Sequence, residues 1–273
     1  MNIQKDTAAI IRKWYDILSF PKCFDREFEA ALDTITVPEQ TAIETYDLQC
    51  SDGRRNLLSF LYMCEALQEQ YRIHGIGEDI LMDTLRDIVR WTENWSLVKG
   101  QLCLFELEWL ARIMRFKLFK VGRLQFCMAP ARQDVPEFGI LQGDPVVELH
   151  IPRGEKMRPE AVDESLKRGK CFLETYFPEY HYDYFTCFSW LLDEKLKDYL
   201  PESSNILHFG NRFHRVYTED NNFIIRFIFR WDTNEENLSG QICTTEFQRT
   251  IRDAVLRGET FHVTAGVMEK SKC

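Results

Sequence analysis

The stretch that decides the fold runs from Pro145 to Leu192 and reads PVVELHIPRGEKMRPEAVDESLKRGKCFLETYFPEYHYDYFTCFSWLL. Its pattern of apolar and polar residues predicts a buried strand over 145–151, a polar loop, an amphipathic helix over 159–177 and a second strand over 184–191. The start of such a helix offers free backbone N–H groups and a partial positive charge. This unit therefore has the geometry that suits a phosphate-bearing ligand.

The residues before this stretch have the periodicity of helices. From Thr7 to about Gly100, apolar residues recur at spacings of three and four, which predicts four or more helices joined by short connections. A further helix is expected over 102–118, and after it the pattern changes to that of strands. At 273 residues the chain is long enough for two modest domains. We predict an α+β protein, with a helical bundle over 1–117 and a mixed α/β domain over 118–273.

The remainder of the second domain is predicted to contain both strands and a helix. Residues 205–217 and 223–230 resemble an antiparallel pair of strands joined by a polar turn. A helix is expected over 244–256, followed by a final strand over 261–267.

Composition and charge exclude several classes of function. The formal charge of −9 argues against a dedicated nucleic-acid binder, which requires a basic face. The nine cysteines are scattered, and none forms a CxxC pair or a His-spaced cluster, so we expect buried, reduced thiols and no metal site. The chain has no apolar run of 18 residues, and it does not begin with a signal-like segment, so we expect a cytoplasmic protein that does not bind membranes.

Three residues of the central stretch are candidates for catalysis. His150 lies where the first strand meets the loop, and an imidazole that titrates near neutral pH suits a general base. The alternative is that His150 only fixes the following turn through a backbone hydrogen bond. Cys187 and Ser189 share one face of the second strand, and this small, partly polar face would suit a ligand groove. The alternative for Cys187 is a core thiol.

A second polar set comes from His208, Arg212 and His214, which would share one side of a continuous strand and could hold an anion. The alternative is a solvated sheet face. The sequence lacks a G-x-S-x-G elbow, a P-loop and a G-x-G-x-x-G fingerprint, so it does not point to hydrolase or nucleotide-binding chemistry of those kinds.

The segments LHIPRG, FTCFSWLL and SSNILHFGNRF, in this order, resemble a bacterial family of acyltransferases. In that family, a helical N-terminal domain precedes a C-terminal domain similar to the GNAT acyltransferase fold. The resemblance implies an N-acyltransferase that uses acetyl-CoA or another acyl-CoA and transfers the acyl group directly to an amine of a small molecule or peptide. For such an enzyme we expect His150 to act as base or orienter, Cys187 and Ser189 to line the groove, and the backbone of Arg153 and Gly154 to lie near the phosphates of the cofactor. The sequence leaves open whether the protein forms an oligomer.

The phosphate loop is where the sequence departs from GNAT enzymes. Their loop has the form Q/R-x-x-G-x-G/A, whereas the matching segment 153–158 has an arginine and one glycine without that spacing. A second candidate loop is 239–241, after the expected strand 223–230.

Two other functions therefore stay open. The poor glycine spacing and the acids Glu160, Asp163 and Glu164 favour a non-catalytic binding module that keeps the fold without a working phosphate loop. A thiol-dependent hydrolase that uses Cys187 and His150 is the third hypothesis.

Overall fold

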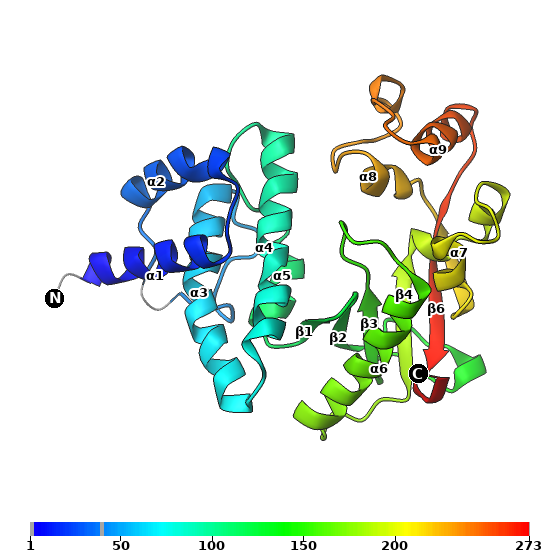
Figure 1. Cartoon of the computed structure of the whole chain (residues 1–273), viewed down its shortest axis with the longest axis horizontal. Helices are drawn as coiled ribbons and strands as arrows, with labels where there is room; N and C mark the ends of the chain where they lie inside the picture. Colours follow the sequence, from blue (N-terminus) through cyan, green and yellow to red (C-terminus); the bar gives the residue numbers. More distant parts are fainter. Residues whose placement is uncertain (1–2, 39–40, 273) are drawn as a thin grey trace. The chain divides into compact units, whose positions relative to one another are not determined.

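The computed structural model describes residues 3–38 and 41–272. The chain divides into two compact units, Met1–Lys120 and Val121–Cys273, and the division falls inside the first strand, β1 (Leu118–Val121). Figure 1 follows the chain through the helices of the first unit and then through the strands and helices of the second. This arrangement confirms the predicted α+β class, with helices first and a mixed α/β region after them.

In its described residues, the first unit is built from helices. They are α1 (Ile3–Ile17), α2 (Asp25–Thr34), α3 (Gly53–His74), α4 (Glu78–Lys99) and α5 (Leu107–Met114). The core contains the fully buried side chains of Trp14, Phe28 and Phe60. Asp52 caps α3 by accepting hydrogen bonds from two backbone N–H groups of its first turn. The predicted helical bundle is confirmed, with short connections between most of its helices.

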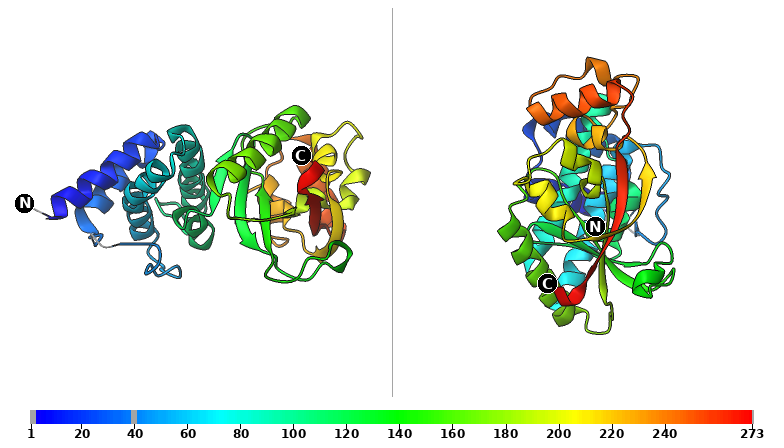
Figure 2. Two further views of the ribbon diagram at one scale, coloured as in Figure 1. Left: turned by 90° about the horizontal axis from the view of Figure 1, so that it is seen from below. Right: turned by 90° about the vertical axis from the view of Figure 1, so that its right-hand side faces the viewer.

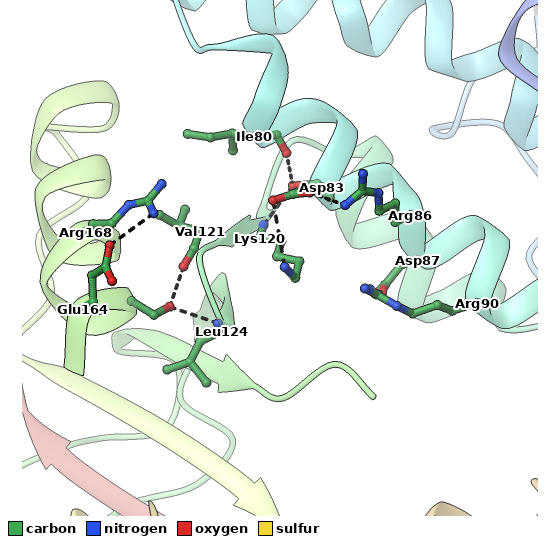
Figure 3. Close-up of polar contacts among 12 residues, drawn as sticks. Ile80, Asp83, Arg86, Asp87, Arg90, Lys120, Val121, Leu124, Glu164 and Arg168 are labelled. Carbon is green, nitrogen blue, oxygen red and sulfur yellow. Dashed lines mark hydrogen bonds and ion pairs between the residues drawn. The ribbon is translucent and has the colours of Figure 1, made fainter. Parts of the chain in front are cut away.

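The end of this unit is attached to α4 by polar contacts. Thr84 donates a hydrogen bond to the carbonyl of Ile80 and accepts one of 2.8 Å from the backbone N–H of Lys120. The ammonium of Lys120 lies 4.0 Å from a carboxylate oxygen of Asp83 (Figure 3). These contacts fix the first residues of β1 on the helical unit.

The described residues contain one six-stranded sheet in the order β1-β2-β3-β4-β6-β5. Its further strands are β2 (Leu124–Pro130), β3 (Pro145–His150), β4 (Tyr184–Ser189), β5 (His214–Asp220) and β6 (His262–Glu269). Strands β3 and β4 are parallel, whereas the β2–β3, β4–β6 and β5–β6 pairs are antiparallel. The parallel pair is possible because a helix crosses over between its strands.

The crossover helix α6 (Pro159–Tyr176) lies along one face of the sheet (Figures 1 and 2). A Cβ atom added at Gly169 would overlap the buried ring of Phe126, so the glycine allows the helix to approach β2 closely. The hydroxyl of Ser165 donates to the carbonyl of Val121 and accepts from the N–H of Leu124 at 3.0 Å (Figure 3). Helix α6 is thus fixed to the β1–β2 hairpin.

The described residues of the second unit also form three shorter α-helices, α7 (Asn205–Gly210), α8 (Ile224–Ile228) and α9 (Glu246–Leu256). Helices α8 and α9 share a core cluster that includes Ile225 and Ile251. Figure 1 shows them beyond the end of the sheet at which β3 and β4 finish. This places a cap of helices at the carboxyl ends of the parallel strands.

The predicted antiparallel pair over 205–217 and 223–230 is wrong. Residues 205–210 form α7, which Ser204 caps by accepting a hydrogen bond from the N–H of Ile206, and residues 224–228 form α8. The strand that does form, β5, pairs with β6. The β-branched residues of α8 are helical because they pack into the cluster shared with α9, so tertiary packing outweighs their strand preference.

The cysteines of the described residues are free thiols. The prediction that they are buried holds for only part of them, because Cys23 and Cys171 are exposed. Cys273 lies outside the described residues. In the part of the chain that the structure describes, no helix is long and apolar enough to cross a membrane. The same residues contain no group of three or more His, Cys, Asp or Glu side chains placed so that they could hold a metal ion.

Candidate active site

Strands β3 and β4 pair along only part of their length. Within the described residues, their ladder joins Val147 to Phe185 and Glu148 to Thr186, and it pairs no residue beyond these. On its other edge, β3 pairs with β2 along all of its residues, and β4 pairs with β6 in the same way. The carboxyl ends of β3 and β4 therefore part, which creates the kind of inner strand edge to which an extended ligand can add.

A charged cluster lies where the two strands part. The Nε of Arg132 donates a 2.8 Å hydrogen bond to Oε1 of Glu148, and Nε2 of His150 lies 3.4 Å from Oε2 of the same carboxylate. Glu148 and His150 are two residues apart on β3, so they project from the same face. Only 7% of Glu148 is exposed, whereas Arg132 and His150 reach solvent in part.

The partners of Glu148 keep its carboxyl group ionised. Burial by itself raises the pKa of Glu148, but the nearby imidazole of His150 and the hydrogen bond from Arg132 outweigh it and hold this pKa well below its ordinary value. A buried, ionised carboxylate beside an imidazole orients the ring and stabilises the imidazolium that forms when the ring accepts a proton. The pair can therefore act as a general base.

A cavity of about 50 Å³ adjoins this cluster. Its polar wall includes Glu148, His150 and Thr186, and apolar residues such as Val146 and Phe188 form much of the remainder. The register places Thr186 on the same face of the sheet as Glu148. The cavity thus lies on the face opposite to helix α6.

Cys187 and Ser189 occupy the second strand as predicted, but their surroundings are different. Cys187 contributes to the cavity wall, yet it is only 2% exposed, and this burial raises the pKa of its thiol. The thiolate that a thiol-dependent hydrolase requires is therefore disfavoured. The hydroxyl of Ser189 caps the turn after β4 by accepting a 3.2 Å hydrogen bond from the N–H of Leu191.

Arg153 and Gly154 lie in the loop that joins β3 to α6. Gly154 has a φ of +111° and open space around it, so the loop bends there in a conformation that side chains rarely adopt. Arg153 donates a 3.3 Å hydrogen bond to the carbonyl of Phe229, and the buried Arg123 donates one of 2.8 Å to the carbonyl of Glu155. The loop is thus held to both α8 and the β1–β2 turn.

The start of α6 follows this loop and has no side-chain cap. Its N-cap residue is Arg158, which makes no capping hydrogen bond, and Pro159 occupies the first helical position. Arg153, Lys156 and Arg158 are all exposed and bring positive charge to the loop. An uncapped helix start beside three cations favours an anionic ligand.

The predicted set of His208, Arg212 and His214 is not a single strand face. His208 lies in α7, and His214 begins β5. Arg212 instead binds Asp163 of α6 at 2.8 Å, and His214 lies 2.8 Å from Glu137. This prediction is wrong because a helix and a turn interrupt the expected strand.

The second candidate phosphate loop, 239–241, is also not placed as expected. The segment before it forms helix α8, so the loop does not join a strand to a helix. The segment 153–158 is the one that connects a parallel strand to its crossover helix.

Sequence reasoning missed Glu148 and Arg132. Glu148 could have been found, because a carboxylate inside an apolar strand, two residues before His150, shares its face. Arg132 carried no such signal, since it lies in a loop whose return to β3 is a property of the tertiary structure.

Comparison with known families agrees with this fold. Residues 118–268, more than half of the chain, match the family described as the GNAT-like C-terminal domain. The chain belongs to this family. Residues 4–116 match the N-acyltransferase N-terminal domain. The GNAT-like C-terminal domain thus contains the parted strands, the charged cluster and the loop.

Solved structures with the same fold are acyltransferases. One is an acyltransferase in complex with decanoyl-CoA and teicoplanin, with a TM-score of 0.77 and 21% identity over 94% of this chain and 87% of that one. Another is an acyltransferase mutant in complex with octanoyl-CoA, with a TM-score of 0.78 and 20% identity over the same shares of the two chains. Among curated proteins, none matches this chain. At these identities the likeness confirms the GNAT-like architecture that the sequence predicted.

Proposed function

We propose that this protein is an acyl-CoA-dependent N-acyltransferase that transfers the acyl group directly to an amine. The observation that carries the proposal is the parting of β3 and β4 beside the Glu148–His150 pair and next to the 153–158 loop. The gap accepts the extended pantetheine arm, and the loop accepts the phosphates. Complexes of similarly folded acyltransferases with decanoyl-CoA and octanoyl-CoA support this assignment.

The reaction uses His150 as the base. The imidazole takes a proton from the attacking amine, and the charge of Glu148 stabilises the imidazolium at 3.4 Å. The amine nitrogen forms a bond to the thioester carbon, the C–S bond then breaks, and the leaving thiolate takes up the proton. Cys187 contributes to the cavity wall although the register places it on the face of β4 opposite to Thr186, and Ser189 shapes the end of β4.

The loop and the start of α6 hold the phosphates of the acyl-CoA. The backbone near Arg153 and Gly154 approaches the pyrophosphate, and the exposed cations supply charge. Glu160 remains an exposed acid in the first turn of α6, but the other two acids oppose this less than the sequence suggests. Asp163 binds Arg212 at 2.8 Å, and Glu164 lies 3.7 Å from Arg168, so part of their charge is neutralised.

The acceptor is proposed to be an amine of a small molecule or peptide in the cytoplasm. The complex of one similar acyltransferase with teicoplanin supports an acceptor of this kind. Acetyl-CoA and longer acyl-CoAs are the co-substrates to compare.

Isothermal titration with CoA and acyl-CoAs tests the proposal. We expect micromolar binding, weakened about tenfold by Arg153→Ala, because a charged hydrogen bond to phosphate is lost. The control is Lys167→Ala, which removes a positive charge at an exposed position of α6 and should change the affinity less than twofold. If folded protein binds no CoA species, the proposal is wrong, and the non-catalytic binding module becomes the better hypothesis.

The base is tested by CoA release in the presence of a panel of amines. We expect His150→Gln to lower the rate about 100-fold while acyl-CoA affinity stays within threefold. Glu148→Gln should lower the rate by a smaller factor, because the imidazole remains but loses its charged partner. If both variants release CoA at the wild-type rate, Glu148 and His150 take no part in the mechanism.

A further inference from the structure

The cavity beside the charged cluster has a largely apolar interior. Its roof is the segment after β2, which contributes Ala131, Val135 and Ile140, and its floor includes Val146 and Val267 of the sheet. Four of these side chains, those of Ala131, Ile140, Val146 and Val267, form one buried cluster. The interior therefore suits an alkyl group and offers little to a charged one.

Several polar groups of the cavity lie on the side where β3 and β4 part, and Gln133 and Tyr217 also line the cavity. Glu148, His150 and Thr186 lie where the strands part, and the guanidinium of Arg132 stands over the ring of Phe188 at 5.4 Å while it binds Glu148. The lining thus combines polar groups at the gap with a buried apolar cluster. An acyl thioester has the same two parts, a polar carbonyl followed by an alkyl chain.

The volume of the cavity limits the length of that chain. An apolar cavity of about 150 Å³ holds benzene, which has six heavy atoms. The present cavity, at about 50 Å³, has about a third of that volume. Resting on the proposed acyltransferase function, we infer that this cavity is the acyl subsite and that it selects short acyl groups of about two to four carbons.

The roof is held in place by backbone contacts, so the limit is built into the fold. Val135 and Ile140 exchange backbone hydrogen bonds of 2.8 and 3.3 Å. The hydroxyl of Tyr184 donates a 2.9 Å hydrogen bond to the carbonyl of Phe138, which fixes the roof to β4. A packed, tethered wall of this kind does not yield easily to a longer chain.

Titrations with CoA, acetyl-CoA, butyryl-CoA, octanoyl-CoA and decanoyl-CoA test the inference. Affinity should rise by about fourfold for each methylene that enters the cavity, which makes butyryl-CoA the tightest ligand of the series. Octanoyl-CoA and decanoyl-CoA should bind at least tenfold more weakly than butyryl-CoA. Tighter binding of decanoyl-CoA than of butyryl-CoA would overturn the inference and leave the acyltransferase proposal intact. Failure of every CoA species to bind would overturn both.

Two variants locate the limit in this cavity. Ile140→Ala removes side-chain atoms from the roof and so enlarges the cavity. It should shift the ratio of octanoyl-CoA to butyryl-CoA affinity at least tenfold toward octanoyl-CoA. The matched control is Ile225→Ala in the α8–α9 cluster, because both isoleucines are 3% exposed, and it should leave the ratio within twofold. Ala131→Leu fills the cavity and should weaken butyryl-CoA about tenfold while CoA itself binds as before. If either folded cavity variant leaves the acyl preference unchanged, the acyl group lies elsewhere.

Discussion

The two faces of the β3–β4 pair are built in different ways. On the face covered by α6, Val147 and Phe185 are fully buried, and the ring of Phe126 packs so closely that only glycine fits at position 169. The opposite face carries the charge of Glu148 and leaves a cavity. The first face is closely packed and stabilises the fold, whereas the second has a cavity and charged groups that a ligand could contact. The two faces of the same strand pair thus differ, one in how closely it packs and the other in the cavity that it leaves open.

The largest expected effect breaks the packed face. Phe126→Ala should lower the free energy of unfolding by about 3–5 kcal/mol, because it removes a fully buried ring and leaves a cavity under α6. The same substitution at Phe188, which is only partly buried on the opposite face, should cost at least about 2 kcal/mol less. Chemical denaturation measures both. Equal losses would contradict the difference between the faces.

An intermediate effect concerns the charge on the open face. Because the pKa of Glu148 is lowered on folding, its contribution to stability is complete above its ordinary value of 4.5 and is lost as the pH falls below that value toward the lowered one. Between pH 6 and pH 3, the wild-type protein should therefore lose on the order of 2 kcal/mol more than Glu148→Gln. Urea denaturation at the two pH values measures the difference. Glu164→Gln, at an exposed position, serves as control and should behave like the wild type.

The last comparison is between the buried and the exposed side of α6. Ser165→Ala should cost about 1–3 kcal/mol, since it leaves the carbonyl of Val121 and the N–H of Leu124 without the buried hydroxyl. The neighbouring change Glu164→Ala breaks only an exposed ion pair with Arg168 and should cost less than about 0.5 kcal/mol. Thermal unfolding of the two variants measures this contrast. A loss at Glu164 as large as that at Ser165 would mean that α6 is not fixed through its buried side.

The sequence predicted the elements whose local pattern and packing agree. The strand–helix–strand unit from Pro145 was correct because apolar runs, a helix-starting proline and a helix-ending proline all favour the same structure. The prediction of two strands over 205–217 and 223–230 was wrong because the apolar residues of these segments suit a strand as well as a short helix. A helix forms there because α8 is buried against α9, and this contact between distant segments cannot be predicted from the local sequence.

The candidate site was predictable in part for the same reason. His150 and the 153–158 loop follow from their place after a strand, and the structure places them at the parted ends of β3 and β4. The groove itself was not predictable, because which strand face α6 covers depends on its contact with β2. Arg132 reaches Glu148 only after the chain has folded back across the sheet.

The hydrogen bond from Arg123 to the carbonyl of Glu155 has a consequence for the affinity of the ligand proposed above. It restrains the middle of the β3–α6 loop, while Arg153 ties the beginning of that loop to Phe229. A loop ordered before its ligand arrives loses little conformational entropy on association. If the loop holds the phosphates as proposed, Arg123 would contribute to affinity in this way from a buried position, and its replacement should act on the preorganisation of the loop without removing a group that a ligand touches.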